Sequence, residues 1–179
     1  KYSKDFNVFK KDLFENKANE AVIDLELPSE LTINGPIELE IRLKLNDSKG
    51  LLSAQIIDFG PKKRLEDKAR VKDFKVLDRG RNFMLDDLVE LPLVESPYQL
   101  VTKGFTNLQN KDLLTVSDLK ADEWFTLKFE LQPTIYHLEK ADKLRVILYS
   151  TDFEHTVRDN RKVTYEIDLS QSKLIIPMK

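Results

Sequence analysis

One alternating segment limits what this chain can fold into. In "PIELEIRLKLN", residues 36–46, every second residue from Ile37 to Leu45 is apolar, and the residues between them are charged. Successive side chains of a β-strand point to opposite faces, so this pattern gives one buried face and one solvated face. Such two-faced strands are typical of antiparallel sheets, because parallel sheets are usually covered on both sides. The segment therefore predicts an antiparallel sheet with a single buried side.

The same alternation recurs along the chain. It is clearest in "WFTLKFEL" (124–131), "KLRVILYS" (143–150) and "KVTYEIDL" (162–169), and weaker strand signals occupy 21–27, 51–59, 74–78, 98–105 and 174–177. Nine short strands separated by turn signals predict an all-β protein, an antiparallel, jelly-roll-like β-sandwich. The phase of the strongest segments predicts that the following side chains are buried: Ile37, Leu39, Ile41, Phe129, Val146 and Ile167.

Little helix is expected. Residues 5–16 place Phe6, Phe9 and Leu13 at helical spacing, and residues 82–91 have the pattern of one or two helical turns. The "NGP" at 34–36 and the proline-bracketed "LPLVESP" at 91–97 predict turns or loops rather than domain boundaries.

Composition excludes several functional classes. The 29 basic and 31 acidic side chains give a net charge of −2, which offers no footprint for nucleic acid or an anionic membrane. No apolar run approaches the roughly 20 residues of a membrane helix, and the opening "KYSKDFNVFKK" is not a secretory signal. The absence of cysteine excludes disulfides and thiolate metal sites and is compatible with a cytoplasmic location. Because the chain begins with Lys1 rather than Met, we expect a fragment of a longer protein.

The stretch "STDFEHTVRDNR", residues 150–161, has the residue types of a catalytic or metal site. Ser150 and His155 are parts of a hydrolase triad, and Asp152, Glu154 and Asp159 are potential calcium ligands. However, no serine of the chain lies in a G-x-S-x-G elbow, and the acidic residues lack the D-x-[DN]-x-[DN]-G spacing of a calcium turn.

We interpret this stretch as a polar turn that follows a strand. Asp and Ser side chains accept hydrogen bonds from turn amides, and Arg158 or Arg161 can pair with a neighbouring carboxylate. An inter-domain contact and a metal site remain alternatives. The only other histidine, His137, has no motif around it. The sequence therefore predicts no catalytic, cofactor-binding or metal-binding residue.

Two further features are open to functional readings. Residues 60–81 carry nine basic and four acidic side chains, which fits either a solvated loop and edge strand or a surface for an anionic partner. Trp124, the only tryptophan, is expected in the core or at a domain interface. The alternative is a carbohydrate-binding platform that Trp124 would form with Tyr98 or Tyr136.

Longer stretches carry a family resemblance. Residues 31–65, "LTINGPIELEIRLKLNDSKGLLSAQIIDFGPKKRL", and residues 131–177 resemble the C-terminal β-sandwich domain of the X-prolyl dipeptidyl aminopeptidase and cocaine-esterase-like hydrolases. In the second stretch, the resemblance lies in a proline-led turn before "LR", an "STDF" loop and a closing "SKLIIP". "KVLDRGRNFMLDDL" and "ESPYQLVTKGFTNLQN" are similar to the X-prolyl branch. One departure is that Ala141-Asp142-Lys143 replaces the family's usual Gly-His pair, so the role of that histidine does not transfer.

The resemblance implies a non-catalytic domain of a cytoplasmic serine exopeptidase that releases N-terminal Xaa-Pro dipeptides. Its catalytic Ser, His and Asp would lie in an α/β-hydrolase domain upstream, which this domain would brace. Residues 1–19 would then be the tail leading from that domain, and residues 20–179 the β-sandwich. We expect Phe6, Phe9 or Phe14 to contribute to an apolar docking patch. Proline-containing peptides would be the parent's substrates, no cofactor is implied, and a homodimeric parent is left open. An independent carbohydrate- or cell-surface-binding module is the alternative.

Overall fold

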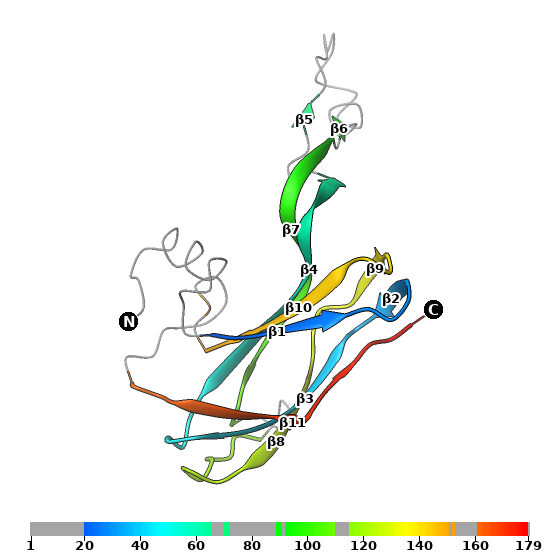
Figure 1. The fold of residues 1–179 in the computed structure, drawn as a ribbon. Coiled ribbons are helices and arrows are strands. Elements are labelled where there is room, and N and C mark those ends of the chain that lie inside the picture. The colour runs from blue at the N-terminus through cyan, green and yellow to red at the C-terminus, as the bar shows by residue number, and fades with distance from the viewer. Residues whose placement is uncertain are drawn as a thin grey trace. The chain divides into compact units, whose positions relative to one another are not determined.

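The computed structural model of the protein describes residues 20–65, 70–71, 89–90, 92–109, 115–150, 152 and 161–178 (Figure 1). These residues form eleven strands and contain no helix. They belong to two compact units. One unit runs up to Asp58 and resumes at Leu100, and the other is Phe59–Gln99. The expected tail, residues 1–19, lies outside the described residues.

One sheet has four strands in the order β1-β10-β4-β7. They are β1 (Glu20–Glu26), β10 (Lys143–Tyr149), β4 (Leu51–Leu65) and β7 (Leu93–Asn107). β1 and β10 are antiparallel, with Glu20 opposite Tyr149 and Glu26 opposite Lys143. β4 and β7 are longer than expected, because both continue into the second unit.

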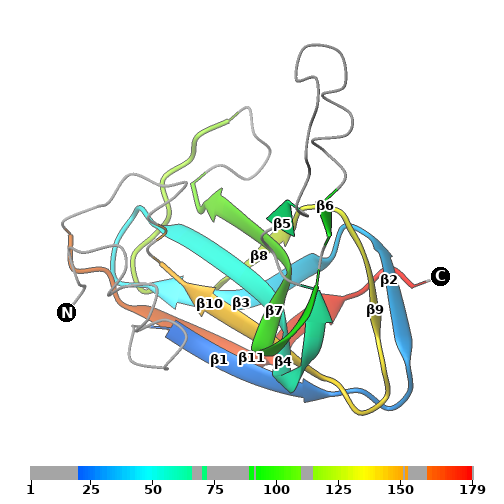
Figure 2. The same ribbon diagram turned by 90° about the horizontal axis from the view of Figure 1, so that it is seen from above.

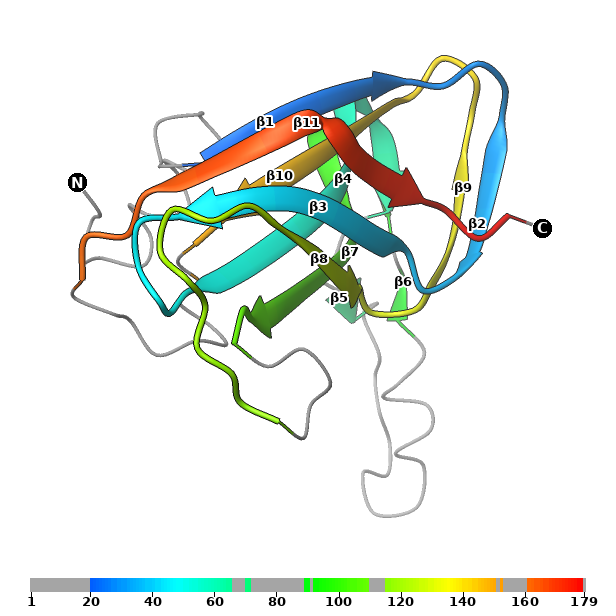
Figure 3. The same cartoon turned by 90° about the horizontal axis from the view of Figure 1, so that it is seen from below.

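A second sheet has the order β11-β3-β8, formed by β11 (Tyr165–Ile175), β3 (Glu38–Leu45) and β8 (Phe125–Glu130). Figure 3 shows these three strands side by side in front of the four-stranded sheet. An antiparallel two-stranded ribbon, β2 (Leu31–Gly35) with β9 (Thr134–Leu138), lies beside them, as the view in Figure 2 also shows.

A single apolar core fills the space between the two sheets. Its buried side chains come from both sheets: Leu39, Ile41, Leu43 and Leu45 of β3, Leu127 of β8, Leu52, Ala54 and Ile56 of β4, Val101 of β7, and Leu144, Val146 and Leu148 of β10. Two antiparallel sheets facing one core are a β-sandwich, so the predicted fold class is confirmed.

The predicted core residues are only partly right. Four of them are buried: Ile37, Leu39, Ile41 and Val146. The other two, Phe129 and Ile167, are half-buried and pack against the margin of the core. Phe129 lies on β8 and Ile167 on β11, the two edge strands that flank β3. An edge strand has a neighbour on one side only, which leaves part of its inward side chains accessible.

β11 joins two segments that were expected to be separate strands, 162–169 and 174–177. Asp168 pairs with Arg42, but Lys173, five residues later, pairs with Glu40, only two residues along β3. Three extra residues are therefore inserted into β11 between these pairs. An odd insertion reverses which residues face the core. As a result Tyr165 and Ile167 pack against the core before the bulge, and the even-numbered Leu174 packs there after it.

Other local expectations need correction. β2 and β9 are strands that the sequence pattern did not predict. The loop expected at 91–97 is also wrong, because β7 begins at Leu93. Residues 82–91 were expected to form one or two helical turns, but Val89–Glu90 of this segment form the strand β6 instead. β6 pairs with β5 (Arg70–Val71). The rest of that segment, the helix at 5–16 and the strand at 74–78 lie outside the described residues. The expected turn at 34–36 is only partly right, because Asn34 and Gly35 belong to β2 and only Pro36 lies outside a strand; the φ of 133° at Gly35 favours glycine.

The second unit, Phe59–Gln99, has a buried arginine of its own. Arg64 is only 4% exposed, and its Nη1 donates to the carbonyl oxygens of Gly60 at 2.8 Å and Ser96 at 2.6 Å. The basic stretch 60–81 therefore does not consist entirely of solvated charges. Most of it lies outside the described residues, so its two readings stay open.

The core position of Ile41 predicts a large effect of truncation. Ile41→Ala should lower the free energy of unfolding by about 2–5 kcal/mol, because it removes buried methylene groups and leaves a cavity. Ile135→Ala is the matched control, since Ile135 is 79% exposed on β9 and should change stability by less than about 0.5 kcal/mol. Urea denaturation measures both. Equal effects of the two substitutions would contradict the assigned core.

Candidate functional site

The polar stretch 150–161 begins directly after a strand, as the sequence indicated. Ser150 follows the end of β10, and Asp152 is buried. At the other end of the stretch, Arg161 donates from Nη1 to Oδ1 of Asp47 at 2.7 Å. The predicted arginine–carboxylate pair is therefore present, although its acid lies in the β3–β4 turn. Glu154, His155 and Asp159 lie outside the described residues.

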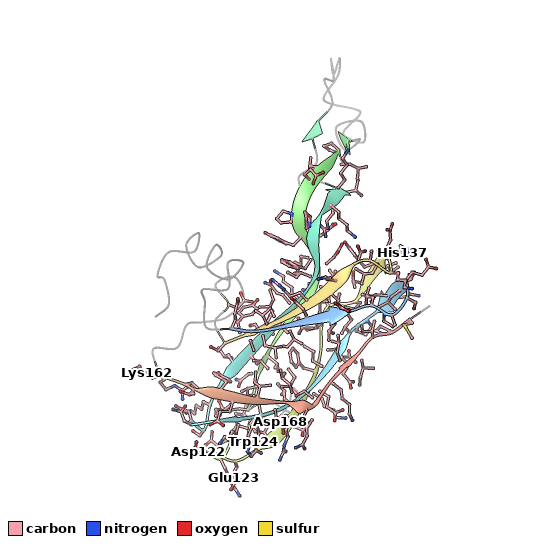
Figure 4. The ribbon with its side chains drawn as sticks, viewed as in Figure 1. Asp122, Glu123, Trp124, His137, Lys162 and Asp168 are labelled. Atoms are coloured by element: carbon pink, nitrogen blue, oxygen red, sulfur yellow. The ribbon has the colours of Figure 1, made fainter. Side chains whose placement is uncertain are left out.

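His137 lies away from the described residue Lys162, which directly follows this stretch (Figure 4). It lies on β9, where Nδ1 shares a hydrogen bond of 3.0 Å with Oγ1 of Thr32 on β2. Figure 4 shows His137 at one end of the sandwich and Lys162, just after the stretch, at the other. Among the residues that the structure describes, no three His, Cys, Asp or Glu side chains gather as a metal site would require.

The outward side of the β11-β3-β8 sheet is a charged face. Glu40 of β3 pairs with Lys128 of β8 at 2.9 Å and with Lys173 of β11 at 3.8 Å. The hydrogen bond with Lys128 lowers the pKa of Glu40 and raises that of Lys128. Lys44 of β3 pairs with Glu166 of β11 at 3.2 Å. Opposite charges on adjacent strands thus neutralise one another across this face.

Trp124 belongs to the charged face and not to the core, so of its two expected roles the core role is wrong and the domain-interface role stays a prediction. Its side chain is 40% exposed, and the Arg42 guanidinium and Lys44 ammonium lie 6.0 Å and 5.3 Å from its ring centroid. Trp124 immediately precedes β8 (Figure 4), whose phase turns Phe125 and Leu127 inward. The alternation itself therefore contained the signal that position 124 faces outward.

Trp124 and Tyr136 are engaged in contacts that do not suit a carbohydrate platform. Two cations already lie over the Trp124 ring. Tyr136 packs against the core, and its hydroxyl donates to Oδ2 of buried Asp58 at 2.9 Å. Tyr98 belongs to the other unit. An independent sugar-binding module is therefore not favoured.

A pocket of about 440 Å³ opens at the end of the sandwich where β10 ends and β11 begins. Its described lining combines apolar and aromatic side chains with the polar Glu20, Ser150 and Thr164, and Glu20 is the only charged residue among the described residues that line it. Both carboxylate oxygens of Glu20 are buried and make no hydrogen bond to any described residue. Nothing in the sequence singled out Glu20, which stands at the head of an ordinary alternating strand.

Burial raises the pKa of Glu20 from its usual 4.5 to about 7. Arg145 acts in the opposite direction, but its guanidinium is held by Asp24, with Nε–Oδ1 and Nη2–Oδ2 distances of 2.5 and 2.8 Å. This bidentate pair lowers the pKa of Asp24. The Arg145 guanidinium is thus paired with the exposed carboxylate of Asp24, four residues after Glu20 on β1. The carboxyl group of Glu20 therefore remains a weak acid.

Comparison with known proteins identifies the family. Residues 1–177 match the sequence profile of the X-Pro dipeptidyl-peptidase C-terminal non-catalytic domain. The chain belongs to this family. A curated relative, the Xaa-Pro dipeptidyl-peptidase of Streptococcus gordonii, is 48% identical over 180 residues, which cover 100% of this chain and 24% of the relative. The chain thus spans about a quarter of the length of that protein.

Solved structures show where else the fold of this X-Pro dipeptidyl-peptidase C-terminal domain occurs. An α-amino acid ester hydrolase matches with a TM-score of 0.65 and 13% identity over 94% of this chain and 27% of its own. A CocE/NonD family hydrolase from Staphylococcus aureus matches with a TM-score of 0.56 and 14% identity, covering 89% and 30%. An aminopeptidase from a Thaumarchaeota archaeon gives 0.55 and 13%, covering 79% and 20%. At these identities the likeness concerns the fold alone.

The family's non-catalytic character agrees with the interpretation of the sequence, which assigned the domain no nucleophile or base. The predicted resemblance is confirmed. In addition, no helix long and apolar enough to cross a membrane occurs among the described residues.

Trp124→Ala should lower the free energy of unfolding by about 1 kcal/mol, well below the effect of Ile41→Ala. The reason is that partly exposed cation–π contacts contribute about 0.5–1 kcal/mol each and that no core cavity is created. Trp124→Phe keeps an aromatic ring and should recover part of the loss. Urea denaturation followed by circular dichroism measures both variants. A loss as large as that of Ile41→Ala would return Trp124 to the core.

Glu20 predicts a pH-dependent contribution to stability. Its folded-state pKa is raised, so the contribution of neutral Glu20 is fully present below about pH 4.5 and is lost as the pH rises through 7. Glu20→Gln should therefore gain stability relative to the unsubstituted chain between pH 5 and pH 8, by about 1 kcal/mol after allowance for solvent screening.

Thermal or urea unfolding of the unsubstituted chain and of Glu20→Gln, each at pH 5 and at pH 8, measures this gain in stability. Glu26→Gln removes the same charge from an exposed position at the other end of β1 and should leave the pH profile unchanged. A Glu20→Gln profile parallel to that of the unsubstituted chain would show that Glu20 titrates as an ordinary carboxylate.

Proposed function

We propose that this chain is the bracing domain of a longer cytoplasmic serine peptidase that releases Xaa-Pro dipeptides from peptide N-termini. The observation that carries the proposal is the 48% identity to the Streptococcus gordonii Xaa-Pro dipeptidyl-peptidase, which extends over all of this chain but only 24% of that protein. The remaining length of such a protein accommodates an α/β-hydrolase domain. In this proposal residues 1–19 lead from that domain and residues 20–179 form the brace.

The proposed division of labour places the chemistry outside this chain. A serine of the hydrolase domain would be acylated with the help of a histidine and an aspartate. The sandwich would contribute a rigid two-layer core against which the hydrolase domain packs, and it would wall one side of the access route. Proline-containing peptides are the proposed substrates. The proposed homodimeric assembly rests on the family resemblance alone.

The charge distribution favours some surfaces over others for this docking. On the charged face, Glu40, Lys128 and Lys173 already neutralise one another. Burying such a network would remove its solvation without forming new pairs, which is costly. The docking contact is therefore proposed away from this face. The expected patch of Phe6, Phe9 or Phe14 lies outside the described residues and stays a prediction.

Three proteins test the proposal: the full-length peptidase, the peptidase without residues 20–179, and this chain alone. With an Xaa-Pro chromogenic substrate, only the full-length protein should show full turnover. The chain alone should stay at background, because it lacks both the triad and the oxyanion hole. The truncated protein should have a lower Tm and a lower kcat/KM. An unchanged Tm and kcat/KM after truncation would exclude the brace.

His155→Ala in the full-length protein is the matched control for chemistry within this chain. It should leave kcat nearly unchanged, whereas substitution of the elbow serine should lower kcat by several powers of ten. Hydrolysis by the isolated chain that disappears with His155→Ala would instead make residues 150–161 an active site.

A further inference from the structure

The pocket at the end of the sandwich is built from both sheets. β1 contributes Glu20, β10 contributes Leu148 and Tyr149, and β11 contributes Tyr165 and Ile167. The hydroxyl of Tyr165 accepts a hydrogen bond from Leu51 N–H at 3.2 Å and donates to Leu51 O at 2.9 Å. These bonds tie the start of β11 to the start of β4. The pocket wall is therefore fixed by contacts between the layers.

Two described polar side chains near Glu20 bond to other residues. Tyr149, opposite Glu20 in the β1–β10 register, accepts a hydrogen bond from Nε2 of Gln55 at 3.1 Å. Arg145 is held by Asp24 through two hydrogen bonds. Both oxygens of Glu20 are nevertheless buried, without a partner among the described residues. A buried carboxylate in that state is costly, and a ligand that supplies a positive charge removes the cost.

The shape and chemistry of the pocket define that ligand further. A volume of about 440 Å³ lies within the range of small-molecule sites. Ala21, Leu52, Leu148 and Val163 offer apolar surface to an aliphatic chain, Ser150 and Thr164 add polar surface, and Glu20 is the only charge among the described lining residues. An anion would meet a like charge in the pocket. A neutral acceptor would require Glu20 to be protonated and would bind more tightly at low pH.

We propose that this pocket binds an alkylammonium or alkylguanidinium group, with the carboxylate of Glu20 holding the cation and the aliphatic side chains of the lining holding the chain. Two sources carry this chemistry: a free amine, and a lysine or arginine side chain from another part of a longer parent protein.

Pentylammonium is the probe, and 1-pentanol is its neutral counterpart of similar size. NMR of the 13C-labelled protein follows binding through the Glu20 carboxyl signal, and the same signal reports the pKa. Pentylammonium should bind and lower the Glu20 pKa, whereas 1-pentanol should bind more weakly and leave it unchanged. Equal binding of the two, or no binding of pentylammonium to this chain and to a longer parent alike, would overturn the proposal.

The pH dependence separates a cation site from a neutral one without any substitution. Among the described residues, the titratable groups around Glu20 are Asp24 and Arg145, which pair with each other, and the pocket tyrosines, Tyr149 and Tyr165. With a Glu20 pKa of about 7, about one-tenth of the protein is ionised there at pH 6, so the Kd for pentylammonium should be about tenfold weaker than at pH 8. Tighter binding at pH 6 would overturn the proposal.

Two variants assign the effect to Glu20. Glu20→Gln should weaken pentylammonium binding at pH 8 by at least tenfold and abolish its pH dependence. Glu26→Gln, which removes an equal charge from the exposed end of the same strand, should keep both. Unchanged binding by Glu20→Gln would contradict the assignment.

The same titration on the full-length parent distinguishes the sources. If a lysine or arginine of the parent fills the pocket, Glu20 in the parent should have an ordinary or lowered pKa and the parent should take up no pentylammonium. If the site serves free amines, both proteins should bind the probe equally. A parent in which Glu20 keeps a pKa of about 7 and the pocket refuses the probe would contradict both.

Discussion

The structure depends on the two-faced strand β3. Its inward side chains, Leu39, Ile41, Leu43 and Leu45, are at most 3% exposed, and they lie at the centre of the core cluster. Its outward residues, Glu40 and Lys44 among them, pair with charges on both neighbouring strands. A slip of one residue would bury these charges and expose the whole apolar set. The register of β11 and β8, and with it the second sheet, is therefore fixed by β3.

This dependence explains how much of the fold could be predicted. Alternation is a local signal, so the strands with the strongest alternation, around Ile41, Leu127 and Val146, could be located from sequence. The bulge in β11 could not, because three inserted residues between Asp168 and Lys173 are visible only against the partner strand. β2 and β9 were missed for a similar reason. They are five residues long each, and it is their pairing with each other that makes them strands.

The candidate sites also differ in whether a local sequence signal could have revealed them. The outward position of Trp124 was implied by the phase of β8, and the expectation of a core role gave more weight to residue type than to phase. Glu20 had no such local signal. Its buried, partnerless state follows from the β1–β10 register, from the Asp24–Arg145 pair and from the start of β11 more than 140 residues later in the chain. Only the folded structure brings these segments together.

The two acidic residues Glu40 and Glu20 show how the environment separates structural charges from functional ones. Glu40 lies between two lysines on a solvated face, where its charge is satisfied and its pKa is lowered. Glu20 lines a pocket with both oxygens buried, and its pKa is raised. The buried carboxylate of Glu20 does not stabilise the fold, because a glutamine at position 20 would avoid the cost of burying an ionised group. A ligand stabilises the protein most where a buried ionisable group lines a pocket and has no partner. The bound ligand then supplies the opposite charge that the folded chain does not provide.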